Sequence, residues 1–219
     1  MKGDKQFLVI GLGRFGSSVA TALARSGHEV LAIDTNEEVA QKLNGIVTHV
    51  VVADTTDEDT LKALGVRNFD VAVVAIGSNI QANIFTTLLL KNLGVPFIVA
   101  KALNDLHGKM LEKLGADRVV YPEYDMGQRV AHNIVTSNVL EYIELSPNVG
   151  IVEIGVPRSL IGKTLIEADL RARFEVNVVA IKRDDQVIVP PQPDAQIEKG
   201  DLLVVVGGNI GIAALEGLQ

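Results

Sequence analysis

The chain has 219 residues, a formal net charge of −7 and 47% hydrophobic residues. It contains no cysteine, which excludes disulfide frameworks and thiolate metal sites. The acidic balance argues against binding nucleic acid by phosphate neutralisation, and no apolar run reaches the roughly 20 residues that would span a bilayer. We therefore expect a cytoplasmic protein that binds no nucleic acid.

The first 122 residues alternate short aliphatic runs with longer amphipathic segments. The runs predict strands at residues 7–10, 30–33, 47–52, 71–76, 97–101 and 118–121, and the segments between them predict helices at about 14–26, 36–44, 57–64, 79–93 and 105–115. Strands and helices that alternate in this way form a parallel sheet through right-handed crossovers. The sequence thus predicts a doubly wound, Rossmann-like α/β domain over residues 1–122. Glycines that can close its helices follow four of the helical segments, at Gly27, Gly65, Gly94 and Gly115.

The pattern changes after Pro122. Apolar residues near helical spacing predict one long helix over residues 123–143, and Ser146-Pro147-Asn148 predicts a linker, so that 123–148 separates two domains. The apolar stripe of this helix packs either on its own domain or on a second copy of the chain. Both alternatives remain open from the sequence alone.

Residues 149–219 predict a second, smaller α+β domain. Strands are expected at residues 151–156, 176–182, 187–189 and 202–206, and helices at 163–173 and 210–218. A domain of this size has a marginal core and gains stability by pairing with a partner. This is an independent indication of a dimer.

A glycine-rich loop, Gly11-Leu12-Gly13-Arg14-Phe15-Gly16, follows the first predicted strand and opens the first predicted helix. In such a loop the first glycine allows the tight turn, the second lets the backbone approach a pyrophosphate, and the third lets the helix pack on the strand. The free amides and the positive end of the helix dipole favour an anion. Asp34 follows the second strand and can accept hydrogen bonds from the ribose hydroxyls. The sequence predicts a bound adenine nucleotide, and a structural turn without a ligand is the alternative.

Arg14 stands at the start of a helix, where the dipole disfavours a cation and a bound phosphate would compensate. An arginine that points into solvent is the alternative. The carboxyl edge of a parallel sheet is where ligands bind. The further candidate contacts in the loop and at that edge are Phe15, Asn36, Asp54, Thr55, Ile76, Gly77 and Lys101. Glu123 follows the sixth strand and either binds a cation near the phosphates or only suits a helix N-terminus.

A catalytic constellation is not recognisable. The histidines at 28, 49, 107 and 132 lie apart in the sequence and match no metal-ligand or nucleophile motif. Hydride transfer would need an acid or base in a substrate domain, and residues 149–219 contain no histidine. We therefore predict a sensor that binds its nucleotide without converting it. A small NAD-dependent oxidoreductase, which would share the loop and Asp34, is the alternative.

The chain resembles the cytoplasmic regulatory subunit of bacterial Ktr/Trk potassium uptake systems. The resemblance rests on FLVIGLGRFG, AIDTNEE, VVADTTDEDTL, VAVVAIGSNIQAN and LGADRVVYPEYDMGQRVAHNIV, in this order and spacing. The second domain is similar through LIGKTLIEADLRARFEVNVVAIKR and GDLLVVVGG. The RFG form of the loop and the YPE motif are most similar to the Ktr subunit, whose modules are called RCK domains.

The resemblance implies a homodimer that assembles into an octameric ring, peripheral to the inner face of the cell membrane and docked on a potassium or sodium-coupled potassium transporter. ATP and ADP would compete for the first domain, with ATP favouring the activated state, whereas NAD(H)-sensing Trk subunits are the alternative. Arg14 would meet a terminal phosphate, from the adjacent subunit, and Glu123 would help to bind Mg²⁺, Ca²⁺ or Na⁺. The helix after Pro122 would be the crossover helix of the dimer.

The resemblance also implies a second ligand, cyclic di-AMP, which would bind between paired C-terminal domains and inactivate the transporter. Arg171 and Asn177 match the positions that contact phosphate and base. Apolar walls are expected from Leu165, Val178 and Pro193.

Overall fold

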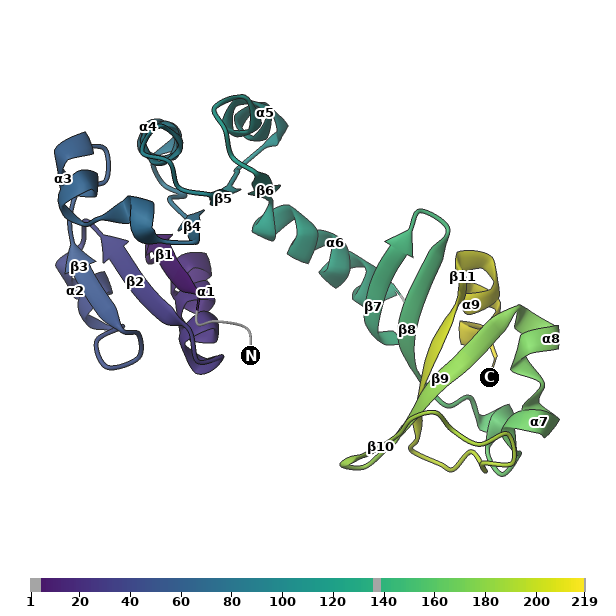
Figure 1. The fold of residues 1–219 in the computed structure, drawn as a ribbon. Coiled ribbons are helices and arrows are strands. Elements are labelled where there is room, and N and C mark those ends of the chain that lie inside the picture. The colour runs from purple at the N-terminus through teal and green to yellow at the C-terminus, as the bar shows by residue number, and fades with distance from the viewer. Residues whose placement is uncertain (1–4, 136–138, 219) are drawn as a thin grey trace. The chain divides into compact units, whose positions relative to one another are not determined.

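The computed structural model describes residues 5–135 and 139–218 (Figure 1). The chain divides into two compact units, residues 1–125 and 126–219. Each unit is described by itself below.

The first unit is built on a six-stranded parallel sheet with the order β3-β2-β1-β4-β5-β6. Its strands are β1 (Gln6–Ile10), β2 (Glu29–Asp34), β3 (His49–Val52), β4 (Val71–Val74), β5 (Phe97–Lys101) and β6 (Arg118–Val120). The chain returns to the centre of the sheet between β3 and β4, so the switch point lies between β1 and β4. The prediction of a doubly wound α/β domain is confirmed.

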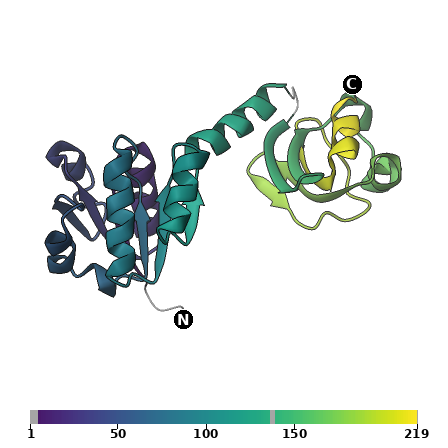
Figure 2. The same cartoon turned by 90° about the horizontal axis from the view of Figure 1, so that it is seen from above.

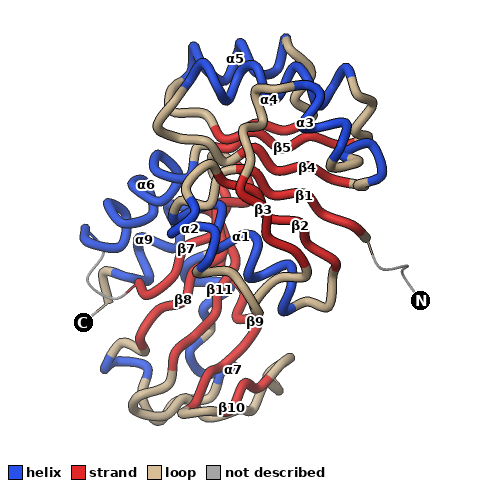
Figure 3. The backbone as a smooth tube through the Cα atoms, turned by 90° about the vertical axis from the view of Figure 1, so that its left-hand side faces the viewer, coloured by secondary structure: helices blue, strands red, loops and turns tan. Residues whose placement is uncertain are grey.

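Helices cover both faces of this sheet because successive strand residues point to opposite sides. On one face, Leu8 and Ile10 pack with residues of α3 (Glu58–Ala63), α4 (Ile80–Asn92) and α5 (Asp105–Lys113). On the other face, Val9 packs with residues of α1 (Arg14–Arg25) and α2 (Glu37–Gln41). Figure 3 shows α4 and α5 on one side of the strands and α1 on the other. A short 3₁₀ helix, η1 (Val66–Asn68), precedes β4.

The four predicted helix-ending glycines follow α1, α3, α4 and α5 and all have positive φ, at Gly27, Gly65, Gly94 and Gly115. In this left-handed conformation a side chain would be strained, and glycine closes the helix without that cost.

The long helix predicted over residues 123–143 is wrong in its second half. Helix α6 spans Pro122–Val135, and strand β7 spans Val139–Ser146. A short apolar run fits the helical and the strand period equally well. Residues 139–146 form a strand because they pair antiparallel with residues 149–154, with Tyr142 opposite Val152.

The predicted linker at Ser146-Pro147-Asn148 is also wrong. Strand β8 (Val149–Gly155) begins directly after these residues and pairs antiparallel with β7. Ser146 ends β7 opposite Val149, and Pro147 and Asn148 form the tight turn of the hairpin. Pro and Asn are as favourable in such a turn as they are in a linker.

The second unit contains a five-stranded antiparallel sheet with the order β10-β9-β11-β8-β7. The remaining strands are β9 (Val176–Arg183), β10 (Gln186–Ile188) and β11 (Leu202–Gly208), and the helices are η2 (Arg158–Leu160), α7 (Leu165–Ala168), α8 (Leu170–Phe174) and α9 (Asn209–Glu216). Ile154, Leu203 and Ile212 share its buried core. Figure 2 shows α9, in yellow, packed on this sheet. An α+β unit is confirmed.

The single helix predicted over residues 163–173 is two short helices. Asp169 separates α7 from α8 with a φ of 44°. Aspartate tolerates this left-handed conformation better than most residues. The break turns the chain between the two helices.

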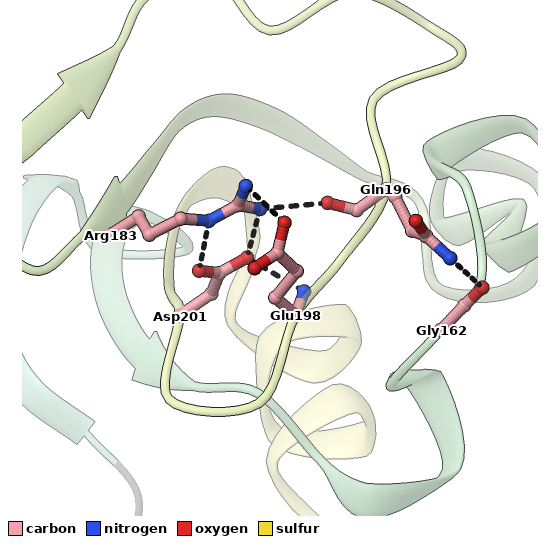
Figure 4. A network of polar contacts seen from close by, with 5 residues as sticks. All are labelled: Gly162, Arg183, Gln196, Glu198 and Asp201. Atoms are coloured by element: carbon pink, nitrogen blue, oxygen red, sulfur yellow. Dashed lines mark hydrogen bonds and ion pairs between the residues drawn. The ribbon is translucent and has the colours of Figure 1, made fainter.

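An ion-pair network holds the loop between β10 and β11 (Figure 4). The guanidinium of Arg183 donates Nε to Oδ1 and Nη2 to Oδ2 of Asp201, each at 2.8 Å, and Nη2 also donates to the carbonyl of Gln196 at 2.9 Å. Glu198 pairs with the same guanidinium. Because the side chain of Asp201 is only 1% exposed, its charge is compensated almost entirely by this network. The guanidinium lowers the pKa of Asp201 below its ordinary range, and Asp201 in turn raises the pKa of Arg183.

Candidate nucleotide-binding site

A cleft of about 670 Å³ opens at the carboxyl edge of the sheet in the first unit. It lies around the switch point, which is where parallel α/β sheets bind ligands. Most of the N-terminal contacts that the sequence predicts lie together in its lining, namely Gly11, Gly13, Arg14, Phe15, Asp34, Asp54, Thr55, Ile76, Gly77, Lys101 and Glu123.

Gly11 and Gly16 shape the loop through close backbone approaches. Gly11 has a φ of +86°, and a Cβ there would lie 2.9 Å from the carbonyl carbon of Ala75. A Cβ on Gly16 would lie 1.8 Å from the carbonyl oxygen of Gly11. Gly16 does not line the cleft and instead lets α1 pack under the loop, as the sequence predicts.

Gly13 opens α1 towards the cleft. It is the N-cap residue, and no side chain accepts a hydrogen bond from the first turn. By contrast, an Asn or Asp side chain caps the first turn of α2, α3, α4 and α5. No acidic residue stands in the first turn of α1 either. The amides and the positive dipole end of α1 are therefore left for an anion, and a Cβ on Gly13 would meet no described atom within 4 Å.

Asp34 orders the loop in addition to lining the cleft. Its Oδ2 accepts a hydrogen bond from the amide of Leu12 at 2.6 Å, and its Oδ1 accepts one from the amide of Asn36 at 2.8 Å. Asn36 itself does not line the cleft, because its side chain accepts from the amide of Val39 and caps α2. Each carboxylate oxygen retains a second lone pair for a ligand.

Lys101 and Glu123 form an ion pair at the cleft. The ammonium of Lys101 donates to Oε1 of Glu123 at 2.5 Å. The side chain of Lys101 is 9% exposed, whereas that of Glu123 is 68% exposed. This hydrogen bond lowers the pKa of Glu123, and the charge of Arg14 contributes more weakly in the same direction. The cleft therefore presents two cations, Lys101 and Arg14, among three carboxylates. The carboxylate of Glu123 is the one paired with Lys101.

The predicted metal ligand, Glu123, does not belong to a cluster of metal-binding side chains among the described residues. Across residues 5–135 and 139–218, no group of three or more His, Cys, Asp or Glu side chains lies close enough to hold a metal ion. Divalent cations require several oxygen ligands. A cation at Glu123 thus needs oxygen atoms from a bound phosphate, and this role remains a prediction.

The sequence did not single out several polar residues of the lining, Thr35, Thr56 and Asn79. Each lies within two residues of a predicted contact, in the segment after a strand. Their position relative to predicted strand ends is the signal that would have found them.

The residues predicted for cyclic di-AMP lie in four segments of the second unit. Leu165 is the first residue of α7, Arg171 lies in α8, and Asn177 and Val178 lie near the start of β9. Pro193 is brought beside α7, because its carbonyl accepts a hydrogen bond from the amide of Ile166 at 3.0 Å. Arg171 and Asn177 are exposed, whereas Leu165 and Val178 are half-buried.

Two domain families match the chain. The TrkA-N domain matches residues 7–122, and the TrkA-C domain matches residues 149–218. The chain is 51% identical over 212 residues to Ktr system potassium uptake protein C of Bacillus subtilis (strain 168), covering 97% of this chain and 96% of that protein. It is also 46% identical over 213 residues to Ktr system potassium uptake protein A of the same organism, with the same coverage. The chain belongs to the family of Ktr system potassium uptake proteins.

Solved structures agree on the fold of this Ktr-family chain. The GsuK RCK domain superimposes with a TM-score of 0.68 at 23% identity, covering 99% of this chain and 48% of that one. The chain thus spans about half the length of the matched GsuK chain. The architecture of an RCK module is confirmed. Among the described residues, no helix combines the length and apolar character that crossing a bilayer would require.

Proposed function

We propose that the chain is a regulatory subunit that gates a membrane potassium transporter in response to ATP and ADP. The observation that carries the proposal is the uncapped N-terminus of α1, which opens into a cleft beside Asp34. Family membership supplies the process, since the relatives are named as potassium uptake proteins.

The charges in the cleft support a ligand whose phosphates matter. The backbone amides of α1 would bind the inner phosphates, and Asp34 would accept from the ribose. In addition to these backbone amides, the side chains of Arg14 and Lys101 supply positive charge in the cleft. ATP and ADP differ in one terminal phosphate, so these cations are suited to tell them apart.

A binding role without chemistry is supported by the composition of the cleft. Among the described residues that line it, the titratable ones are Arg14, Asp34, Asp54, Lys101 and Glu123, and none is a histidine. Lys101 is paired with Glu123, and both oxygens of Asp34 accept backbone hydrogen bonds. A general acid or base needs a free group placed on the reacting atoms.

Signalling then follows from population shift. Each nucleotide must bind one conformation of the assembly more tightly than the other, and the transporter reads the difference. The proposed assembly is a homodimer that builds an octameric ring on the cytoplasmic face of the membrane. In α6 the apolar side chains of Met126, Val130 and Ile134 are exposed, which supports a role for this helix in pairing two copies.

Two further ligands belong to the proposal. A Mg²⁺, Ca²⁺ or Na⁺ ion would bind between Glu123 and the nucleotide phosphates, which supply the missing oxygen ligands. Cyclic di-AMP would bind to the second unit through Arg171 and Asn177, with Leu165, Val178 and Pro193 as apolar walls. The exposure of the two polar side chains leaves them available for a ligand or a second copy.

Calorimetric titration of the purified chain with ATP, ADP and NADH tests the nucleotide assignment. We expect ATP and ADP to bind competitively and more tightly than NADH. A clear preference for NADH would overturn the assignment in favour of an NAD(H)-sensing subunit, and turnover of NADH with a small alcohol or hydroxy acid would indicate an oxidoreductase. Co-purification with a multi-span potassium transporter tests the partner.

A further inference from the structure

The carboxyl ends of β4 and β5 diverge as they enter the cleft. Their parallel pairing ends at Val74 and Ala100. Beyond that point the side chain of Asn83, in α4, bridges the segment after β4 and the end of β5. Its Nδ2 donates to the carbonyl of Ile76 at 2.7 Å and to the carbonyl of Lys101 at 3.0 Å. One amide group thus replaces the hydrogen bonds that the sheet no longer provides.

Both bridged residues line the cleft. A Cβ on Gly77, the residue after Ile76, would lie 3.3 Å from Nζ of Lys101, so the ammonium lies directly beside the backbone of Gly77. The separation of the two strand ends therefore sets where this cation stands relative to the loop that follows β4.

A second polar contact joins α4 to the segment that follows β3. Oγ1 of Thr86 lies 2.9 Å from Oγ1 of Thr55 and also donates to the Thr55 carbonyl at 3.3 Å. Thr55 lines the cleft as well. Through polar side chains, helix α4 thus contacts the chain at or just after the ends of β3, β4 and β5.

These side chains occupy positions where a helix normally buries apolar groups. Asn83, Thr86 and Thr87 are all 0% exposed, and burying an amide or hydroxyl is unfavourable unless it is hydrogen-bonded. The three differ in their bonding. Nδ2 of Asn83 and Oγ1 of Thr86 are hydrogen-bonded, whereas Oδ1 of Asn83 and Oγ1 of Thr87 have no partner among the described residues. Only Asn83 and Thr86 are bonded to the walls of the cleft.

We propose that Asn83 is a positioning residue of the nucleotide site. By holding the ends of β4 and β5 at a fixed separation, it places the Lys101 ammonium where it meets the anionic part of the ligand. This inference rests on the proposed function, because it concerns the affinity of the same cleft. Asn83 does not line the cleft itself, and it acts through Lys101.

The test is a double-mutant cycle of Asn83→Leu and Lys101→Met, with ADP binding measured by calorimetry. Leucine keeps the size of the side chain and removes both hydrogen bonds, so we expect Asn83→Leu to weaken ADP binding roughly tenfold. In the Lys101→Met background the same change should weaken binding less than about twofold, because the displaced cation is already absent. A structural defect alone would weaken binding equally in both backgrounds.

Thr87→Val is the matched control, since it alters a buried hydroxyl of the same helix that has no described partner. It should bind ADP like the wild type. If Asn83→Leu does not fold, the same cycle is measured with Asn83→Ser, which keeps a hydrogen-bond donor. Unchanged ADP affinity of the Asn83 variant, or an equal loss with and without Lys101, would overturn the inference.

The two proposals fail in different ways. If the wild-type chain prefers NADH to ATP and ADP, the nucleotide assignment fails. The cycle is then measured with NADH, whose pyrophosphate offers the same kind of anion to Lys101, and its coupling still decides the role of Asn83.

Discussion

Substituting Gly16 by alanine should damage both the fold and the nucleotide site of the first unit. The new Cβ would lie 1.8 Å from the carbonyl oxygen of Gly11 and 3.0 Å from the Cβ of Ala75. The first contact is with backbone, so no side-chain rotation relieves it. Helix α1 would have to move away from the loop by about 1.6 Å for this pair to reach an ordinary van der Waals contact of 3.4 Å. Overpacking of this kind costs about 3 kcal/mol of unfolding free energy.

Gly13→Ala is the matched comparison in the same loop. Gly13 has a φ of −62°, which alanine adopts freely, and its Cβ would meet no described atom within 4 Å. At an N-cap position the free energy of unfolding should fall by at most about 1 kcal/mol. The methyl group would, however, enter the space where the phosphates approach the α1 amides. Loss of two charge-assisted hydrogen bonds weakens binding by roughly a hundredfold.

Urea denaturation gives the unfolding free energies, and calorimetry with ADP gives the affinities. We expect Gly16→Ala to lower both stability and affinity, and Gly13→Ala to lower affinity with little loss of stability. Tight ADP binding by the Gly13 variant would refute the reasoning, because a phosphate would then not approach the amides of α1. Wild-type stability of the Gly16 variant would show that the loop is less constrained than its contacts indicate.

Three further predictions concern single side chains. Arg14→Ala should weaken ATP more than ADP in calorimetry, and an equal loss would show that Arg14 does not sense the terminal phosphate. Arg171→Ala should abolish cyclic di-AMP binding in equilibrium dialysis and leave ATP affinity unchanged; loss of both would point to misfolding. Asp201→Asn should destabilise the second unit by about 2 kcal/mol in urea denaturation, because it leaves the partly exposed Arg183 without its main partner. Since Arg183 lowers the folded-state pKa of Asp201, this stabilisation is present above the ordinary pKa of 3.8 and is lost as pH falls through the lower folded value. A pH profile as steep in the variant as in the wild type would contradict that origin.

The first unit could be predicted from the sequence because several local signals agree there. Strands buried on both faces are aliphatic throughout, and glycines such as Gly27 and Gly65 end helices where the hydrophobic pattern also ends. The loop was predictable for the same reason, since its glycines stand between a strand and a helix. Consistent local signals of this kind specify a fold.

The second unit was harder to predict because its local signals are ambiguous. Residues 139–143 fit a helix by spacing, yet they form part of β7 through pairing with β8. The helical pattern of residues 163–173 continues through Asp169, yet this residue has a positive φ and separates two helices. When a short segment fits both periods, its secondary structure depends on the strands that pair with it. Local patterns in the sequence do not contain that information.

Pairing between side chains of distant segments was beyond prediction altogether. Lys101 and Glu123 were each predicted at the site, but as separate contacts to phosphate and cation. The structure joins them in an ion pair. A phosphate that takes the ammonium would release the carboxylate, so the two predicted roles depend on each other.

Asp34 has two roles, of which the sequence predicts only one. The sequence predicts a ribose contact, and the structure adds two backbone hydrogen bonds, from Leu12 and Asn36, that hold the loop in place. Replacing the carboxylate by an amide would direct an NH₂ group at one of these amides and disturb the loop as well as the ribose contact. A mutation of Asp34 therefore cannot test ribose recognition by itself. Removing a hydroxyl from the sugar of the ligand can, because Asp34 and its hydrogen bonds to the loop stay intact.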